Sequence, residues 1–532
     1  MIWLLVGCAT PPDRLPAGNA GSATLEQLGV VTCLDPAARD AAPFEIVELP
    51  GEVVASEPPE GGQYDGGGMA VGDFDGDGLL DLYLPNTGPD QLYLGSGAGF
   101  VSADDRLPDA GRAADRSTGA ATADVDGDGD LDLFIADQGG DQQIWLNQDG
   151  VFSFDESGVA GGGWDGVGGT FADFDGDGDV DLFAYAHYEG HELSDGMVAG
   201  KMPPGHPDAL YRNRGDGTFE DVSSLLPLAL RGDSYTLAAG WYPDASVGAF
   251  TLFVVNDFGP FSVPNMALRW NGESLDDVSD EIGFNLAIYG MGLGVGDLND
   301  DGTPDFAMTS WDQLALQLSS PSGWFDAALA RGFTPLGDDR HVAWGVVLAD
   351  LDNDGDLDAP VSFGTLQMPD EIRTQLEDEL GLHNPLVQRD ALYVQGGDGV
   401  FTEEAEAWGV ADGGTERGVL AVDIDRDGWL DLIKRDALGP TKVYHARCGA
   451  EAWLEVGFAG EGVAARVDVN ADGRNQFRWI SAGGEGFASG GPPEAHFGLA
   501  TANTVSLEVV WPDGSHDEFF DIPTRQRVIV SR

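Results

Sequence analysis

Basic residues are scarce in this chain. Lysine and arginine together number 26, against 92 aspartates and glutamates, which gives a formal net charge of −66 over 532 residues. The chain therefore has no basic stripe to displace counterions from a nucleic-acid backbone, and an anionic membrane surface would repel it. We expect no nucleic-acid partner, and contact with a membrane only through a lipid anchor.

Long hydrophobic runs are also missing, since no segment reaches the ~20 apolar residues that cross a bilayer. The chain starts with a short apolar stretch ending in Leu5-Val6-Gly7-Cys8, which resembles a bacterial lipobox with Cys8 as the lipidated residue. A chance apolar start is the alternative, because the basic region of a secretory signal is absent. We interpret residues 1–8 as a lipoprotein signal remnant and residues 9–43 as a tether. The expected location is extracytoplasmic: an outer membrane or cell surface lipoprotein of a bacterium, or a secreted protein.

Cysteine occurs only three times. If Cys8 carries lipid, Cys33 and Cys448 are left as an even pair in an oxidising compartment, where a disulfide is expected. Two unrelated free thiols are the alternative.

Catalytic motifs are absent: there is no Gly-x-Ser-x-Gly elbow, no His-Glu-x-x-His helix and no phosphate-binding loop. The chain is 42% hydrophobic with 78 glycines and 29 prolines, a composition typical of a folded, turn-rich β-protein. One helix is expected near residues 369–382, where apolar side chains recur every four residues.

A nine-residue pattern, Asp-x-Asp/Asn-x-Asp-Gly-x-x-Asp, occurs six times. Its side-chain oxygens at positions one, three, five and nine suit Ca²⁺, and the glycine permits a tight loop. An EF-hand is excluded, because position twelve never holds glutamate and the flanks resemble strands. Turns without metal are the other alternative, but four crowded carboxylates cannot all stay ionised without a cation. We expect about six Ca²⁺ ions, with position seven binding through its carbonyl. The candidate metal residues are Asp73, Asp75, Asp77, Leu79 and Asp81; Asp124, Asp126, Asp128, Asp130 and Asp132; Asp173, Asp175, Asp177, Asp179 and Asp181; Asp297, Asn299, Asp301, Thr303 and Asp305; Asp350, Asp352, Asp354, Asp356 and Asp358; and Asp423, Asp425, Asp427, Trp429 and Asp431.

The third and fourth copies lie 124 residues apart, a gap that leaves room for a degenerate unit. Aligning Leu182-Phe183 with Leu252-Phe253 places Pro243, Ala245, Val247 and Thr251 at the ligand positions, so this unit is expected to keep its strands and bind no metal. Seven units result, each with about four short strands, which is typical of the blades of a β-propeller. The predicted fold is all-β: a seven-bladed β-propeller followed by a small C-terminal β-domain.

The last blade is short of an outer strand, and Phe44-Glu-Ile-Val-Glu resembles the outer strands of the other blades. We expect residues 44–50 to complete this blade and close the ring. Cys33 would then lie near the point where Cys448 emerges, which favours a disulfide between them.

The blades resemble the FG-GAP/VCBS repeats of integrin-α-type propellers. Several C-terminal segments, among them Trp453-Leu-Glu-Val, Ala495-His-Phe-Gly-Leu499 and Val509-Val-Trp-Pro-Asp-Gly514, resemble an ASPIC/UnbV domain. Together, and in this order, they resemble bacterial relatives of cartilage acidic protein. The resemblance implies an extracytoplasmic Ca²⁺-binding propeller over residues 44–447 and an ASPIC/UnbV-like domain over residues 448–532, with no settled activity.

Two classes of function remain open. The first is a monomeric, cell-surface binding or adhesion module for a protein or glycan ligand. The second is an extracytoplasmic enzyme acting on polysaccharides, a lyase or hydrolase with its site at the propeller mouth. The missing catalytic motifs favour the binding module.

Overall fold

The computed structural model describes residues 23–31, 33, 43–53, 66–96, 99–107, 116–154, 157–159, 165–188, 196, 201–244, 249–336, 341–366, 370–383, 385, 388–460 and 462–532. These residues are almost entirely β-structure, with a few short helices. No helix among them has the length and apolar character needed to cross a bilayer. Cys8, the predicted lipid attachment point, lies outside the described residues.

Seven four-stranded antiparallel sheets occupy the chain between residues 44 and 446. In chain order their strands are β3 (Ala70–Gly72), β4 (Asp81–Leu84), β5 (Gln91–Ser96) and β6 (Gly99–Ser102); β7 (Ser117–Ala123), β8 (Asp132–Asp137), β9 (Gln143–Gln148) and β10 (Val151–Phe154); β11 (Gly166–Ala172), β12 (Asp181–Ala186), β13 (Ala209–Asn213) and β14 (Phe219–Asp221); β15 (Thr236–Asp244), β16 (Ala249–Asn256), β17 (Met266–Trp270) and β18 (Leu275–Asp277); β19 (Gly290–Gly296), β20 (Asp305–Ser310), β21 (Gln313–Leu318) and β22 (Phe325–Asp326); β23 (Ala343–Val346), β24 (Ala359–Phe363), β26 (Ala391–Gln395) and β27 (Phe401–Glu403); and β29 (Glu416–Val422), β30 (Asp431–Asp436), β31 (Lys442–Ala446) and β2 (Phe44–Val47).

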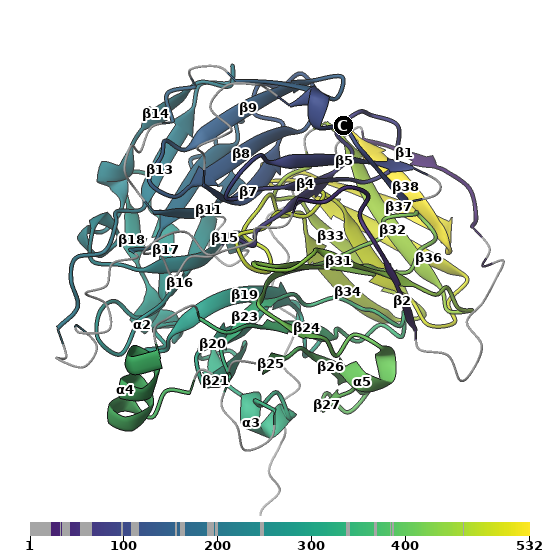
Figure 1. The fold of residues 1–532 in the computed structure, drawn as a ribbon. Coiled ribbons are helices and arrows are strands. Elements are labelled where there is room, and N and C mark those ends of the chain that lie inside the picture. Colours follow the sequence, from purple (N-terminus) through teal and green to yellow (C-terminus); the bar gives the residue numbers. More distant parts are fainter. Residues whose placement is uncertain are drawn as a thin grey trace, which may run out of the picture.

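The first strand of each sheet packs against the first strand of the next, from β3 through β7, β11, β15, β19 and β23 to β29. Val419 and Leu420 of β29 then share a hydrophobic cluster with Met69 and Val71 beside and within β3, which closes the series. The sheets therefore follow one another around a common axis, as in a propeller (Figure 1).

The inner strands are rich in glycine and alanine because the sheets converge at the axis. Gly119 in β7 shows the constraint. A Cβ at this position would clash with the carbonyl oxygen of Val167 on the neighbouring inner strand. Larger side chains begin one strand further out, where the hydrophobic clusters lie between neighbouring sheets.

The remaining elements are short. They are a two-stranded ladder of β25 (Gln388–Arg389) with β28 (Gly413–Gly414), the 3₁₀ turns η1 (Asp104–Arg106), η2 (Ser223–Leu225) and η3 (Leu228–Arg231), and the helices α2 (Ser279–Ile282), α3 (Ala328–Arg331), α4 (Asp370–Leu380) and α5 (Ala405–Trp408). Helix α4 confirms the helix expected near residues 369–382. Its Leu376 is 2% exposed and belongs to the cluster that contains Trp311 and Val342.

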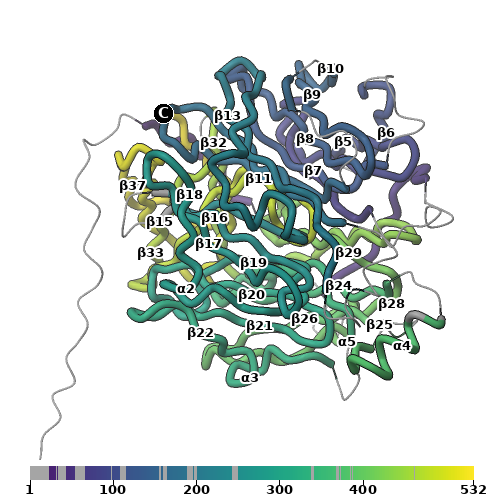
Figure 2. Tube along the Cα trace, turned by 90° about the vertical axis from the view of Figure 1, so that its left-hand side faces the viewer, coloured from purple at the N-terminus to yellow at the C-terminus, as the bar shows by residue number. Residues whose placement is uncertain are grey.

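The C-terminal domain consists of two further four-stranded sheets around their own hydrophobic cluster. In Figure 2 this domain, in yellow, lies on one side of the ring and α4 lies on the opposite side. Its strands are β32 (Trp453–Ala459), β33 (Arg466–Ala471), β34 (Arg474–Trp479), β35 (Ala495–Gly498), β36 (Thr504–Val510), β37 (His516–Pro523) and β38 (Gln526–Ser531), joined by β1 (Thr24–Gln27) from the start of the chain.

The N-terminal segment binds both domains. Strand β2 pairs with β31 in the register Phe44↔Ala446, which confirms that an N-terminal strand completes the last blade. The expectation that residues 9–43 form only a tether is wrong in part. Strand β1 pairs with β38, where it covers an otherwise open sheet edge and packs Leu25 against the C-terminal core.

A disulfide joins Cys33 to Cys448, as the ring-closure argument favoured. Cys33 lies between β1 and β2 along the chain, and Cys448 lies where the chain passes from β31 to β32. It therefore fixes the N-terminal segment to the junction of the two domains.

The segment 481–491 of the C-terminal domain, which we call the axial loop, enters the centre of the ring. Its Ala488 carbonyl accepts a hydrogen bond from the Ala120 N–H, and its Ala482 carbonyl accepts one from the Phe171 N–H. Gly486 forms a β-bridge with Leu293, and Gly490 forms one with Ala70. The axial loop thus contacts inner strands on several sides of the ring and fills its centre.

Replacing Cys33 and Cys448 by serine is expected to lower the free energy of unfolding by about 2–4 kcal/mol, because the open chain gains conformational freedom in the unfolded state. Amide hydrogen exchange should also accelerate at residues 24–27 and 44–47, which the disulfide holds against their partner strands. Denaturant unfolding and exchange mass spectrometry measure both effects. An unchanged unfolding midpoint with unchanged exchange would contradict this prediction.

Candidate metal centres

The six acidic loops lie at equivalent places in the fold. Each follows the first strand of its sheet and leads into the second, so that Asp81 opens β4 and Asp132 opens β8. The sequence that connects the first two strands of the fourth sheet lacks the acidic pattern. There the pairing of β15 with β16 extends to Asp244↔Ala249. Thr251 pairs with Tyr242, and this pair is equivalent to Asp181 with Ala172 in the third sheet. The predicted degenerate unit has therefore kept its strands.

The aspartate at position nine of every loop is at most 1% exposed and accepts two backbone hydrogen bonds. In the second sheet, Asp132 Oδ2 accepts from the Val125 N–H and Oδ1 accepts from the Asn147 N–H, both at 2.8 Å. One carboxylate thus connects the loop to the second and third strands. The equivalent residues are Asp81, Asp181, Asp305, Asp358 and Asp431.

Positions one and five hold the loop in its tight turn. In the first loop Asp73 Oδ2 accepts from the Gly78 N–H at position six, and Asp77 Oδ1 accepts from the Leu79 N–H at position seven. The same two bonds occur in the other five loops. The glycine at position six has φ between 83° and 102° in all six copies, where a side chain would be strained.

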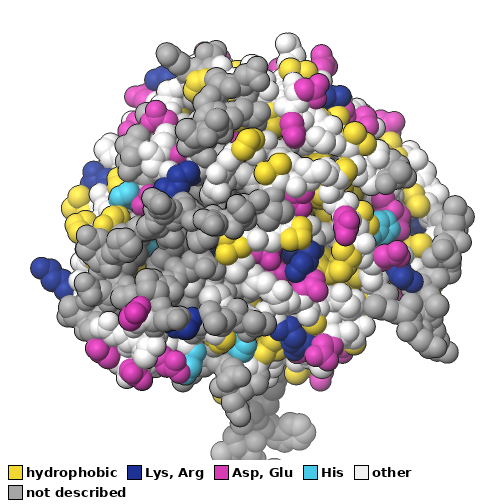
Figure 3. Space-filling model, in the orientation of Figure 1, with side chains coloured by type: hydrophobic (Ala, Val, Ile, Leu, Met, Phe, Trp, Pro, Cys, Tyr) yellow, Lys and Arg dark blue, Asp and Glu magenta, His cyan; other side chains and the backbone are white. Residues whose placement is uncertain are grey.

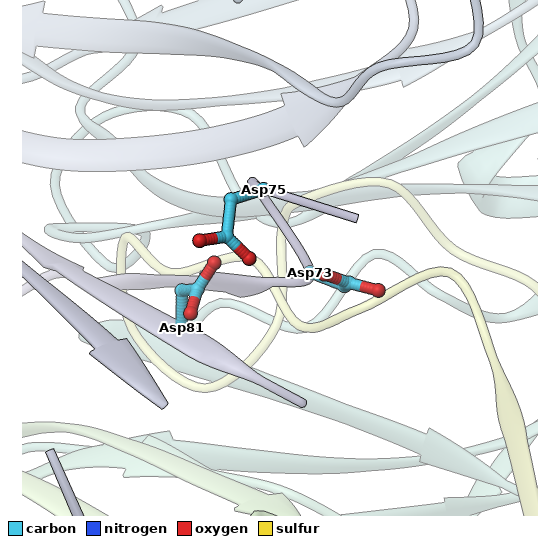
Figure 4. Close-up of side chains that lie close together, drawn as sticks. All are labelled: Asp73, Asp75 and Asp81. Atoms are coloured by element: carbon cyan, nitrogen blue, oxygen red, sulfur yellow. The ribbon is translucent and has the colours of Figure 1, made fainter. Parts of the chain in front are cut away.

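The loops bring positions one, three and nine together. In five of them one carboxylate oxygen from each of these aspartates lies within 4.8 Å of the others. Figure 4 shows the first cluster, in which the carboxylates of Asp75 and Asp81 face each other beside Asp73. Position five is not part of these clusters, and position seven enters the loop through its N–H. The clusters are Asp73, Asp75 and Asp81; Asp124, Asp126 and Asp132; Asp173, Asp175 and Asp181; Asp350, Asp352 and Asp358; and Asp423, Asp425 and Asp431.

Several of these oxygens are buried without a hydrogen-bond partner. Arg106 binds Asp75 Oδ2 at 3.1 Å, and Arg212 binds Asp175 Oδ2 at 2.6 Å, while Oδ1 of each aspartate has no partner. Asp73 Oδ1 is also unpartnered. A buried carboxylate oxygen without a donor is costly unless a cation completes its environment. The donor set therefore fits a hard divalent cation.

Burial governs the protonation of these carboxylates. Desolvation raises the pKa of Asp81 and Asp305 to about 7 and that of Asp132, Asp181 and Asp431 to about 8. Neighbouring aspartates of the same loop add to the increase. Without a cation, the folded protein thus favours the protonated form of these groups near neutral pH.

The loop in the fifth sheet differs from the others. Asn299 replaces the aspartate at position three, and its carbonyl oxygen accepts from the Asp301 N–H at 3.0 Å. The second oxygen of Asp301 accepts from the Ser319 hydroxyl at 2.7 Å. This loop therefore has one negative charge fewer and an additional internal hydrogen bond.

The sequence interpretation missed the residues that support the loops. The Asn147 side-chain N–H donates to the Phe74 carbonyl and the Asn213 side-chain N–H donates to the Val125 carbonyl, each at 2.8 Å, so that each asparagine ties a loop of the preceding sheet to its own. Asn147 is the penultimate residue of β9 and Asn213 the last residue of β13, and this recurrence was a usable signal. Arg106 and Arg212 lie at different sequence separations from the loops they bind, so no recurring spacing marked them as supporting residues.

Comparison with known families identifies the parts of the chain. A family model described as an FG-GAP-like repeat matches residues 73–135 and 124–184, and a model described as ASPIC and UnbV matches residues 459–532. The chain thus carries FG-GAP-like repeats and a C-terminal ASPIC/UnbV domain.

The chain is also similar to cartilage acidic protein 1. It is 26% identical to the Mus musculus protein over 324 residues, which is 58% of this chain and 46% of that protein. It is 24% identical to the Xenopus tropicalis protein over 483 residues, covering 84% and 70%. The chain thus spans about half the length of the mouse relative. Similar solved structures include YCF48 from Cyanidioschyzon merolae, at 8% identity and a TM-score of 0.42 over 76% of this chain and 99% of that one, and BBS1N in complex with ARL6DN, at the same identity and TM-score over 76% and 98%.

We predict that the stability of the metal-free protein falls as the pH rises from about 4 to about 8. The folded-state pKa values of the ninth-position aspartates lie above the ordinary value of 3.8, so the stability that protonation provides is complete below about pH 4 and is lost as the pH passes through 7 to 8. The loss should amount to several kcal/mol, on the order of the shift at each carboxylate.

Urea unfolding in metal-free buffer at pH 5 and pH 8 measures this effect. Asp132→Asn keeps one acceptor oxygen and removes one titrating group, so its dependence on pH should be shallower. Equal unfolding midpoints at the two pH values would contradict the prediction.

Proposed function

We propose that this protein is an extracytoplasmic, calcium-binding propeller that serves as a binding module for a protein or glycan. The observation that carries the proposal is the recurrence of one loop geometry in six sheets, in five of which carboxylate oxygens converge at positions one, three and nine. The FG-GAP-like repeats and the similarity to cartilage acidic protein 1 support it.

Calcium is the cation that best suits these loops. The side-chain donors are all oxygens, as Ca²⁺ prefers, and no histidine or cysteine belongs to any of the described clusters. Four carboxylates per loop, or three with Asn299, would bind the ion through positions one, three, five and nine, with the carbonyl of position seven as a further ligand. Bound Ca²⁺ would supply the positive charge that the buried aspartates lack.

An extracytoplasmic location agrees with the disulfide between Cys33 and Cys448, because such bonds persist in oxidising compartments. The segment Leu5-Val6-Gly7-Cys8 supports attachment to a membrane by lipid at Cys8. Incorporation of a labelled fatty acid into the wild-type protein, and its loss in Cys8→Ser, would test the anchor.

The face opposite the C-terminal domain is our candidate for the partner surface. Hydrophobic, acidic and basic side chains intermingle on it (Figure 3). Helix α4, which lies between the second and third strands of the sixth sheet along the chain, is on this side of the ring (Figure 2). The loops of the opposite side are instead committed to the cation and to the C-terminal domain.

Binding to a glycan array and pull-down from the producing organism, each in calcium and in chelator, test this function. Calcium-dependent capture of one ligand would support the binding module. The alternative, a lyase or hydrolase at the propeller mouth, would be favoured by cleavage of a polysaccharide panel. The axial loop fills the centre of the ring on the side of the C-terminal domain, so such a site would have to open on the opposite face.

We predict that the purified protein binds about six Ca²⁺ ions and that chelator lowers its melting temperature by more than about 10 °C. A ligand that binds only the folded state adds about 1.4–2.7 kcal/mol per site at 10- to 100-fold excess over Kd. Elemental analysis and thermal unfolding measure the two quantities.

A double substitution, Asp126→Ala with Asp128→Ala, should remove one ion and reproduce only a fraction of the loss caused by chelator, since five other loops stay intact. A stoichiometry of two or fewer, or a melting curve that chelator leaves unchanged, would show that the loops are structural turns.

A further inference from the structure

The six acidic loops differ in what covers them. At position six, Gly129 and Gly178 are exposed, whereas Gly355 and Gly428 are buried. Position four shows the same contrast, because Gly127 is exposed while Asn353 is 1% exposed. We call residues 350–358 and 423–431 the covered loops, and residues 124–132 and 173–181 the open loops. The loops 73–81 and 297–305 are intermediate, because Gly78 and Gly302 at position six are neither exposed nor buried.

The C-terminal domain covers loop 423–431 by direct contact. A Cβ on Gly428 would overlap the ring of Trp453. The Gly428 carbonyl lies 3.1 Å from His496 Nε2, and the His496 ring stacks on Trp453. Both aromatic residues come from the C-terminal domain, which therefore packs on the backbone of the loop itself.

Charged groups reinforce this contact. Arg426, at position four of the loop, binds Glu455 at 2.5 Å and Glu494 at 2.6 Å. Arg527 binds the same two glutamates at 2.7 and 2.9 Å. Glu455 is 2% exposed, so two arginines hold two buried glutamates of the C-terminal domain beside Asp423.

Loop 350–358 is covered in the same way. A Cβ on Gly498 would overlap the carboxylate of Asp350, and the Asn353 carbonyl accepts from the Ala500 N–H at 2.8 Å. Arg474 binds Asp356 at 2.6 Å, and it also binds Asp300 of the neighbouring loop at 3.3 Å.

A cavity of about 150 Å³ separates the two domains at this point. Asp350 and Asp423, the first-position residues of the two covered loops, both line it, and so do Glu485 and Glu494 of the C-terminal domain. Without cations in the covered loops, docking brings acidic residues of the domain beside the acidic side chains of the loops. With cations bound, the same surfaces would be complementary in charge.

We propose that calcium binding at the two covered loops and docking of the C-terminal domain are one linked equilibrium, whereas the open loops bind their ions independently. The inference rests on the proposed calcium function. Because such coupling is reciprocal, docking strengthens binding at the covered loops and slows release of their ions, and those ions in turn hold the domain and its axial loop in place.

The test measures release of Ca²⁺ from the loaded full-length protein after mixing with a fluorescent chelator. Two kinetic classes are expected, with the slower class, of about two ions, leaving at least about ten-fold more slowly than the faster one. Elemental analysis of the loaded protein comes first. A content of two ions or fewer would contradict the proposed calcium function itself. Six bound ions that are all released at a single rate would contradict only the linkage.

Arg474→Glu tests the role of docking. The substitution places a carboxylate beside Asp356 and Asp300, and by charge alone it would strengthen calcium binding and slow release. If the slowly released ions instead leave this variant about ten-fold faster than the wild type, the cause is loss of docking. Arg532→Glu is the matched control, because Arg532 binds Asp513 within the C-terminal domain. Equal slow rates in the wild type and both variants would overturn the proposal.

The reciprocal test uses the same substitution in two loops. Asp352→Asn and Asp126→Asn each remove one negative charge at position three, from a covered and an open loop respectively. Hydrogen exchange of residues 481–491 should accelerate at least about ten-fold in the first variant and stay at the wild-type rate in the second. Equal exchange in the two variants would contradict the linkage.

Discussion

In each of the six loops, a buried carboxylate at position nine accepts one backbone N–H from the loop and one from the third strand of the sheet. Asp132 illustrates the consequence: the group cannot leave the interior without breaking two hydrogen bonds of 2.8 Å, yet burial raises its pKa to about 8. The fold thus buries a carboxylate whose charge the interior disfavours, so the group needs either a proton or a nearby positive charge. The proposed cation at positions one and three would supply that charge, and strand pairing and metal binding would then use the same residue.

The recurrence of this arrangement made much of the fold predictable from the sequence. The nine-residue pattern marks the end of one strand and the start of the next, so it located the strand pairs and the positions of the loops. The degenerate unit was visible because Leu252-Phe253 keeps the strand pattern after Thr251 replaces the ninth aspartate. Strand β2 was also predicted, because a four-stranded repeat that lacks one strand implies that another part of the chain provides it.

The contacts between the domains could not be predicted in this way. The axial loop contains Gly483, Gly484 and Gly486, all with positive φ, which in the sequence suggest only a turn-rich segment. Its position depends on Ala120 and Phe171, more than 300 residues earlier, and no local pattern encodes such pairings. Strand β1 was missed for a similar reason. Thr24–Gln27 is largely exposed, and a short strand whose partner is the last strand of the chain carries no alternation strong enough to separate it from a tether.

Charge balance explains the positions of three arginines. Arg426 of the propeller binds Glu455 and Glu494 of the C-terminal domain, as Arg527 does, while Arg474 of the C-terminal domain binds aspartates of the loops. The proposed cations inside the loops and the arginines between loop and domain would therefore neutralise different parts of the same acidic face. The opposite face carries α4, whose Leu376 packs into the hydrophobic core, so that face also helps to hold the ring together.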